Sequence, residues 1–319
     1  MNMATDINVV IPAYKPDEKL IQIFKALSSQ TMPVSKIIVM NTMTGGEEAE
    51  VFELAKKHNY IIDTDFINVF NITKDQFDHG RTRNEGASHI NDECEFVVFM
   101  TQDAVPYNDR LVEELVKPFE DDNVGASYAR QMPSDTSSLA ERFTRGFNYP
   151  DKDSIKTEAD IETIGIKAFF CSNVCACYRR SIFDKLGRFV NRAIFNEDMV
   201  YANKLIKSGY SIAYASKAMV IHTHEYSGMQ QYRRNFDLAV SQKMNPQAFE
   251  GISSESEGVK YVKAAFAYFA KAGRPLKIIP FGINCVYKYM GYRKGKRYES
   301  LTKEQVLKST SNPGFFKDI

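Results

Sequence analysis

The sequence predicts an α/β fold in which a mostly parallel sheet carries helices on both faces. Three runs that are apolar at nearly every position, residues 8–12, 36–40 and 96–100, alternate with amphipathic stretches. Such continuous runs are typical of parallel strands that are buried on both sides. Open sheets of this kind bind their ligands at the carboxyl ends of the strands. The segments at those ends, 12–15, 41–44 and 101–104, are therefore the first candidates for a functional site.

The rest of the chain continues this alternation and adds a helical region at the end. Two further apolar runs predict strands over 169–178 and 212–221, and residues 131–168 read as a loop that contains one helix. A stretch rich in Ser, Glu and Gly at 250–258 predicts a linker before a helix over 259–271. Apolar residues at three- and four-residue spacings predict the other helices, over 19–28, 47–58, 84–91, 138–147, 180–186 and 196–208.

Composition excludes several classes of protein. Of the 319 residues, 44% are apolar and 25% are charged, as in folded globular chains and unlike disordered, collagen-like or small disulfide-rich ones. No apolar run is long enough to span a membrane, and residues 1–10 lack the features of a signal peptide. We therefore expect a cytoplasmic protein whose five cysteines are reduced.

Three cysteines, Cys171, Cys175 and Cys177, cluster in the strand predicted over 169–178. A zinc site would need a second Cys or His pair at a suitable spacing, and none follows. Cys175 and Cys177 share one face of a strand, because alternate residues do. We therefore expect them to be small buried side chains rather than metal ligands.

The formal net charge of +1 is the sum of two opposite charges. Residues 1–257 contain 28 Lys and Arg against 37 Asp and Glu, whereas residues 258–298 contain ten Lys and Arg and no acidic residue. Nine aromatic residues are interleaved with these cations, a mixture that suits an anionic membrane surface. The alternative is that this region packs against the rest of the chain, or pairs two copies, with its Lys and Arg side chains reaching into solvent.

Two acidic clusters fall at the ends of predicted elements. Gln102 and Asp103 follow the strand over 96–100, which would hold a carboxylate at the ligand-binding edge. The alternative for Asp103 is a helix cap or a turn. Glu197 and Asp198 begin the helix over 196–208, where acidic residues also interact favourably with the helix dipole.

Two further clusters contain histidine and arginine. His222 and His224 follow the strand over 212–221, and their spacing places both imidazoles on one side, as a divalent-cation site requires. The alternative is one structural and one solvated histidine. Residues 78–84 open a helix with two arginines, which suits a phosphate or diphosphate. The alternative there is a solvated helix start with surface ion pairs.

The order of these clusters resembles the family 2 glycosyltransferases, which have the GT-A fold. Residues 9–14 look like the opening strand of those enzymes, and residues 37–41 match the second strand, whose end contacts the nucleoside. Asp103 lies where the family has its metal-binding Asp-x-Asp, and residues 196–198 lie where it has its Glu-Asp base motif. The bacterial rhamnosyltransferase branch, which builds rhamnose-containing cell-wall or O-antigen polysaccharides, is more specifically similar over residues 77–87, 101–104, 222–227 and 287–296.

The resemblance implies an inverting, metal-dependent transferase. Asp103, with His222 or His224, would bind Mg²⁺ or Mn²⁺ on the donor diphosphate. Asp198, beside Glu197, would take the proton of the acceptor hydroxyl. The implied donor is dTDP-L-rhamnose and the implied acceptor is a lipid-linked saccharide. The implied donor-binding residues are Pro12, Tyr14, Asn41, Asp78, His79, Arg81, Arg83, Asn84, Gln102 and Asp103.

Two positions depart from the family pattern. Thr101 replaces the first Asp of the metal motif, and Asn41 stands where many relatives have Asp. The metal site therefore depends on one carboxylate plus histidine. The resemblance divides the chain into a GT-A catalytic domain over 1–250, with a nucleotide-sugar half to about residue 130 and an acceptor half over 131–250, and a basic helical region over 251–319.

Two other functions fit parts of the sequence. One is a family 2 transferase that uses a UDP-hexose donor, and the other is a non-enzymatic module that binds nucleic acid or a membrane surface through the basic region. The clusters at element ends and the acidic body disfavour the module, and we expect no nucleic-acid partner. Residues 258–298 are the expected contact with the inner face of the cell membrane, or with a second copy in a homodimer.

Overall fold

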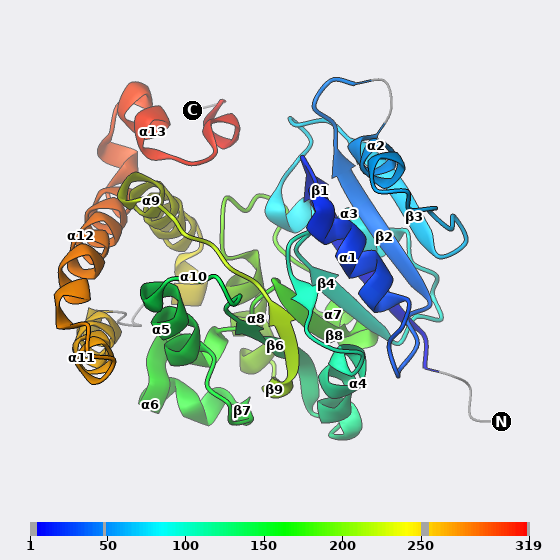
Figure 1. Ribbon diagram of the computed structural model, residues 1–319, viewed down its shortest axis with the longest axis horizontal. Helices are drawn as coiled ribbons and strands as arrows, with labels where there is room; N and C mark the ends of the chain where they lie inside the picture. The colour runs from blue at the N-terminus through cyan, green and yellow to red at the C-terminus, as the bar shows by residue number, and fades with distance from the viewer. Residues whose placement is uncertain (1–4, 47–48, 250–254, 318–319) are drawn as a thin grey trace.

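The protein consists of a central sheet between two layers of helices, with further helices at one end (Figure 1). The computed structural model describes residues 5–46, 49–249 and 255–317. Within these residues the sheet has nine strands in the order β3-β2-β1-β4-β8-β6-β9-β5, with β7 beside β9. The strands are β1 (Ile7–Tyr14), β2 (Lys36–Thr42), β3 (Ile67–Ile72), β4 (Phe96–Met100), β5 (Val105–Pro106), β6 (Val124–Met132), β7 (Ser154–Lys156), β8 (Cys175–Arg179) and β9 (Ser211–Ile221).

The first half of the sheet is parallel and the second half is mixed. β1 pairs in parallel with β2 and β4, and β2 with β3. β8 runs antiparallel to both of its neighbours, β4 and β6, whereas β6 and β9 are parallel. The predicted α/β fold is confirmed, and its continuous apolar runs are the parallel strands.

Helices cover both faces, so each strand contributes to two cores. Val9 and Ile11 of β1 belong to one core and Val10 to the other, as alternation along a strand requires. The first core is covered by α1 (Glu18–Leu27), α2 (Glu50–Lys57) and α4 (Leu111–Val116). The second core is covered by α3 (His79–Ser88), α7 (Arg180–Lys185) and α8 (Glu197–Lys207).

Several segments differ from the sequence prediction. β3 was missed because Asn68 and Asn71 interrupt its apolar run, which is tolerated in a strand at the edge of the sheet. Helix α3 begins at His79 rather than residue 84. The strand predicted over 169–178 was too long, because Gly165–Phe169 form a 3₁₀ helix and β8 starts only at Cys175. Residues 131–168 contain not only the expected helix, α5 (Leu139–Asn148), but also β7 and α6 (Ile161–Ile164).

The cysteine cluster is buried, as predicted. Cys171, Cys175 and Cys177 are at most 1% exposed, and Cys175 and Cys177 lie together in the core on the α1 side of the sheet. All five cysteines are free thiols. The cluster therefore serves packing.

The C-terminal helices pack on α5 and on α9 (Gly228–Met244). α11 (Glu255–Lys271) and α12 (Ile278–Gly295) contribute Phe269 and Phe281 to a cluster around Phe143 of α5. After α9 and the short α10 (Pro246–Phe249), α13 (Lys303–Ser309) and the turn Pro313–Phe316 return to α9 through Val306 and Phe316. In the described part of the chain, no helix combines the length and the apolar character needed to cross a membrane.

The predicted linker at 250–258 is only partly described. Residues 250–254 lie outside the described residues, and residues 255–258 belong to α11. The division into domains at residue 250 stays a prediction.

Candidate active site

Strand direction brings the predicted site residues to one edge of the sheet. β6 and β9 run in the same direction as β1 to β4, because β8 is antiparallel to both β4 and β6. Their carboxyl ends therefore meet at one edge, where Gln102 follows β4, Gln131 lies near the end of β6 and His222 follows β9. Since β8 runs the other way, Asn173, two residues before its start, also reaches this edge.

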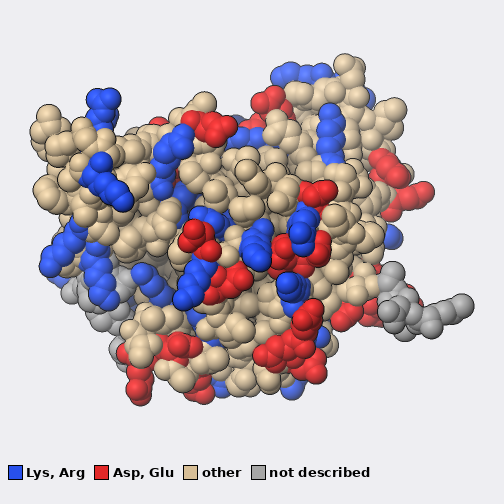
Figure 2. Space-filling model, turned by 60° about the horizontal axis from the view of Figure 1, so that its bottom comes forward, with Lys and Arg blue, Asp and Glu red and all other residues tan. Residues whose placement is uncertain are grey.

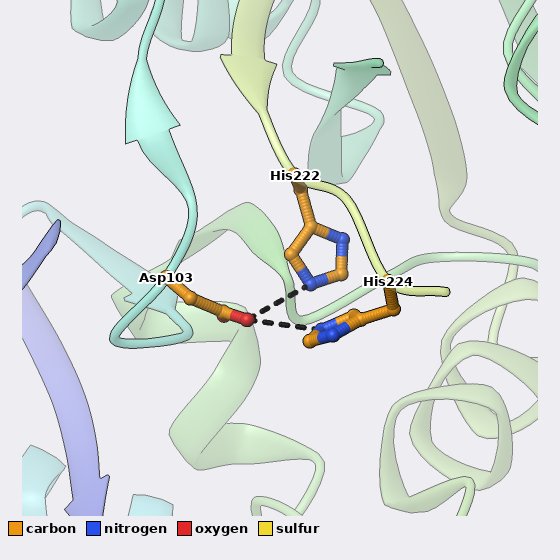
Figure 3. A group of neighbouring side chains, drawn as sticks. All are labelled: Asp103, His222 and His224. Atoms are coloured by element: carbon orange, nitrogen blue, oxygen red, sulfur yellow. Dashed lines mark ion pairs between the residues drawn. The ribbon is translucent and has the colours of Figure 1, made fainter. Parts of the chain in front are cut away.

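Asp103, His222 and His224 form one cluster at this edge (Figure 3). Nε2 of His224 lies 2.9 Å and Nε2 of His222 lies 3.6 Å from Oδ2 of Asp103. The three ligand atoms all lie within 4.8 Å of one another. Ligands about 2.1 Å from one ion are roughly 3 to 4 Å apart, so small side-chain movements would place all three on one cation.

Gln131 fixes the orientation of His222. Its Oε1 accepts a hydrogen bond from Arg145 and lies 2.9 Å from Nδ1 of His222. Because this oxygen is only an acceptor, Nδ1 carries the proton and donates it, which leaves the Nε2 lone pair directed at Asp103. Burial lowers the pKa of His222, against the opposing effect of Asp103, so the neutral form is favoured.

Asp103 is held as a carboxylate. Its burial opposes ionisation, but the adjacent His222 and His224 outweigh the burial and bring its pKa well below the usual range. A carboxylate facing the lone pair of a neutral imidazole is an arrangement that a cation stabilises. The donor set therefore fits a divalent metal ion.

The acidic pair is positioned by the start of α8. Asn196 adopts the left-handed backbone conformation (φ 60°), which Asn tolerates better than most residues, and the helix then begins with Glu197 and Asp198. Oδ2 of Asp198 accepts a hydrogen bond of 3.2 Å from the backbone N–H of Asn173. Burial and the nearby charge of Glu197 raise the pKa of Asp198 to about 7. Such a carboxylate is poised to accept a proton near neutral pH.

Glu197 is directed into the protein instead. Its Oε1 lies 3.1 Å from Nη1 of Arg83 and accepts a 3.1 Å hydrogen bond from Nδ2 of Asn173. Both side chains of the Arg83–Glu197 pair are less than 10% exposed. Burial alone would raise the pKa of Glu197, but Arg83 and His79 reverse this effect and lower it. The pair therefore joins α3 to α8 in its ionised form.

The remaining residues at the start of α3 divide into structural and exposed ones. Asp78 caps the helix by accepting from the N–H groups of Gly80 and Arg81, and its other oxygen accepts from Ala193. Asn84 binds the backbone of Phe189 through both ends of its amide. His79 is half-buried, and burial lowers its pKa. Arg81 is exposed and lines a cleft. A ligand in the cleft can therefore reach Arg81, whereas Arg83 is buried.

The ends of β1 and β2 are tied to the same edge. Gln102 accepts from the backbone N–H of Tyr14 and donates to its carbonyl oxygen, which clamps the end of β1 beside Asp103. Pro12 lies beyond the β1–β4 pairing, which ends at Val10, so its missing N–H costs no hydrogen bond on that side. Asn41 is fully buried, and its amide donates to Glu50 and Asn71.

A cleft of about 1060 Å³ opens beside this edge. Tyr14 and Thr42 contribute strand ends to its lining, residues 74–78 and 191–195 contribute loops, and His79 and Arg81 contribute the start of α3. Residues 303–317 form a wall that the sequence did not predict. Lys317 and Asp75, which both line the cleft, form an ion pair. The cations in the lining are Lys74, Arg81, Arg192, Arg234, Lys303 and Lys317, against the acidic residues Asp75, Asp78 and Asp237.

Arg234 joins this cleft to the histidine cluster. The ring of Tyr226 stacks on His224 with 5.1 Å between centroids, and the guanidinium of Arg234 lies 4.6 Å from the centroid of Tyr226. Sequence reasoning missed Arg234, Gln131 and Asn173. The rule that strand ends carry function would have found Gln131, but Arg234 lies inside a helix and gives no such signal.

Comparison with known proteins agrees with this geometry. Residues 8–187 match glycosyl transferase family 2. The chain belongs to this family. The glycosyltransferase is 34% identical over 298 residues to the O-antigen chain rhamnosyltransferase RfbN of Salmonella typhimurium, covering 92% of this chain and 91% of that protein. It is 35% identical over 281 residues to the O-antigen chain rhamnosyltransferase WbaN of Salmonella anatum, covering 87% and 85%.

Solved structures share the fold of the glycosyltransferase at low sequence identity. The mannosyltransferase PcManGT from Pyrobaculum calidifontis, in complex with GDP-Man and Mn²⁺, superposes with a TM-score of 0.62 at 13% identity and covers 92% of this chain and 88% of that one. S. aureus TarS 1–349 in complex with UDP-GlcNAc superposes with a TM-score of 0.51 at 12% identity, and the match covers 92% of both chains. The GT-A-like fold with a helical C-terminal region is thereby confirmed.

Because Arg83 forms a buried ion pair with Glu197 and Arg81 is exposed, we expect different effects from replacing the two arginines of α3. Arg83→Ala leaves Glu197 as an uncompensated buried charge and is expected to lower the free energy of unfolding by about 3–5 kcal/mol. Arg81→Ala removes an exposed side chain and is expected to change it by less than about 0.5 kcal/mol. Urea denaturation followed by circular dichroism measures both. An Arg83→Ala protein that is as stable as wild type, but binds nucleotide weakly, would show instead that Arg83 contacts the donor.

Proposed function

We propose that this glycosyltransferase transfers L-rhamnose from dTDP-L-rhamnose to a lipid-linked saccharide during synthesis of a bacterial cell-surface polysaccharide. The observation that carries the proposal is the similarity to two O-antigen chain rhamnosyltransferases over most of this chain and of both relatives. The site described above supplies groups for each part of the reaction.

The cleft is the proposed donor site. Its volume suits a nucleotide sugar, since small-molecule sites span about 300–1000 Å³. The exposed ring of Tyr14 and the end of β2 near Thr42 would hold the nucleoside. Arg81 and Arg234 line the cleft, so they would pair with the diphosphate. We assign Asn41, Asp78, Arg83 and Asn84 to shaping this site from within. Asn41 and Arg83 are buried against Glu50 and Glu197, and Asp78 and Asn84 bind backbone groups.

Asp103, His222 and His224 would hold the metal ion. Two imidazoles and one carboxylate suit Mn²⁺ better than Mg²⁺, which prefers oxygen ligands. When bound, the cation supplies positive charge to the leaving nucleoside diphosphate. Gln131 acts in support, because its contact with Nδ1 keeps Nε2 of His222 available as a ligand.

Asp198 is the proposed general base. It would accept the proton of the acceptor hydroxyl while that oxygen forms a bond to the anomeric carbon and the bond to the diphosphate oxygen breaks. This single displacement inverts the anomeric centre and needs no covalent enzyme intermediate. The N–H groups of Asn173 and Met199 fix the carboxylate, and Glu197 holds Asn173 in place by accepting a hydrogen bond from its side chain.

The proposed place of action is the inner face of the cell membrane. The five free cysteines suit a reducing compartment, and a lipid-linked acceptor would be presented at the membrane surface.

Donor choice is tested with purified protein, Mn²⁺ and a synthetic lipid-linked saccharide. We expect release of dTDP from dTDP-L-rhamnose and a product that carries one additional rhamnose, measured by mass spectrometry. UDP-glucose and UDP-N-acetylglucosamine serve as matched donors. Faster turnover of a UDP-hexose would reject dTDP-L-rhamnose and leave the family assignment intact.

Asp198→Asn is expected to lower turnover by about 10²–10⁴-fold, because the amide accepts no proton, while dTDP affinity changes little. In wild type, kcat should rise as pH passes through about 7, since the raised pKa of Asp198 leaves it protonated below that pH. Turnover at several pH values and calorimetric titration of dTDP measure both effects. Wild-type turnover in Asp198→Asn would remove this residue from the base role.

Asp103→Asn is expected to weaken Mn²⁺ binding by about 100-fold or more, because it removes the one negative charge among the three ligands. His224→Ala should weaken binding by at least tenfold. Asp109→Asn, at an exposed acidic residue six positions after Asp103 in the sequence, is the matched control and should bind Mn²⁺ as wild type does. Electron paramagnetic resonance of free Mn²⁺ gives the affinities. Equal affinity in Asp103→Asn and wild type would contradict the metal assignment.

A further inference from the structure

The outward side of α12 carries a stripe of exposed apolar side chains. Ile279, Ile283, Val286 and Met290 recur at spacings of four, three and four residues, and each is more than half exposed. These spacings place all four side chains on one face of the helix. The opposite face is already packed, since Phe281 lies in the cluster around Phe143 and Gly291 lies against α9.

α11 repeats this pattern. Val259, Val262 and Phe266 are spaced by three and four residues and are between 39% and 58% exposed, whereas Ala265 and Phe269 face the core. Leu276, in the turn between the two helices, is 77% exposed. We call the exposed apolar residues of both helices and this turn the α11–α12 surface. Such a concentration of exposed apolar side chains on two consecutive helices is typical of an interaction site.

Cations accompany the apolar residues. Arg293, Lys294 and Arg297 lie on the same side of the chain at the end of the α12 stripe, and Lys263, Lys271 and Lys277 are exposed around α11 and the turn. Residues 258–298 contain no Asp or Glu. Lys and Arg gather at the end of the molecule where these helices lie (Figures 1 and 2).

The charges on this surface favour an anionic membrane over a second copy of the chain as its partner. A symmetric pair of copies would bring together two surfaces that carry cations, and residues 258–298 offer no acidic partner, which costs energy. An anionic bilayer instead offers phosphates to Lys and Arg and an apolar interior to Ile, Val, Phe and Leu. We propose that the α11–α12 surface docks on an anionic phospholipid membrane, with its apolar side chains inserted at the boundary between headgroups and acyl chains.

The surface is fixed relative to the active site. A Cβ at Gly291 or Gly295 of α12 would lie within 2.4 Å of a carbonyl oxygen of α9, so the two helices are in close backbone contact. α9 begins four residues after His224 and carries Arg234 of the cleft. The role we assign to membrane docking, delivery of a lipid-linked acceptor, rests on the proposed function. Membrane binding itself does not require catalysis.

The test is co-sedimentation of the full chain with vesicles of phosphatidylcholine, with and without phosphatidylglycerol, and without any sugar substrate. We expect wild type to bind only the anionic vesicles, and more weakly as salt is raised. The variants I283S/V286S and R293E/R297E are each expected to bind at least about tenfold more weakly. The matched controls are I61S and K57E, which change an exposed apolar residue and an exposed cation on the other half of the protein.

Each outcome decides the inference. Weak binding by both surface variants, wild-type binding by both controls and unchanged turnover of a water-soluble acceptor support it. Equal binding of wild type to neutral and anionic vesicles, or equal loss in the controls, rejects it. If the surface variants lose a dimer, measured by analytical ultracentrifugation, but still bind vesicles, the surface contacts a second copy and the membrane proposal is rejected. Turnover of the soluble acceptor is read separately, so failure of docking is distinguished from failure of the proposed function.

Discussion

The reversed direction of β8 is the constraint on which the active site depends. β8 lies between β4 and β6 and is antiparallel to both, so the residues before it meet the residues that follow β4 and β9. Asn173 thereby reaches the acidic pair of α8, with its backbone N–H on Asp198 and its side chain on Glu197. A parallel β8 of the same five residues would place Asn173 about 17 Å away, at the opposite edge.

A second constraint separates the roles of two adjacent acids. Successive residues of a helix point about 100° apart, so Glu197 faces the interior while Asp198 stays at the sheet edge. Arg83 keeps Glu197 ionised. Burial and the charge of Glu197 raise the pKa of Asp198, and the charge of Arg83 itself partly opposes this rise. The arginine therefore acts on the proposed base without contacting it. Two positive charges that look equivalent in the sequence, Arg81 and Arg83, thus serve a ligand-facing and a buried role.

The placement of site residues at the ends of parallel strands was predictable from the sequence. Asp103 follows a continuous apolar run, and His222 and His224 follow another, so all three were expected at the same edge of the sheet. The resemblance to family 2 glycosyltransferases then implied that they form one metal site. Asn173 was hidden because its position depends on where β8 begins, and the apolar residues 169–171 suggested an earlier start. The wall at residues 303–317 was hidden because long-range packing through Phe316 and the Asp237–Thr310 hydrogen bond places it, and neither leaves a local pattern.

Helix α9 connects the acidic part of the chain, residues 1–257, to the basic part, residues 258–298. This helix follows the histidines of the proposed metal site, carries Arg234 into the cleft, holds residues 310 and 311 through Asp237 and contacts α12 at Gly291 and Gly295. The C-terminal region therefore does two things at once, because one part walls the cleft and another presents cations and apolar side chains outward. Since close backbone contact leaves α12 little freedom on α9, an acceptor held at that outer surface would approach the sheet edge in one orientation. A near-neutral total charge thus arises from an acidic catalytic body rigidly joined to a basic surface.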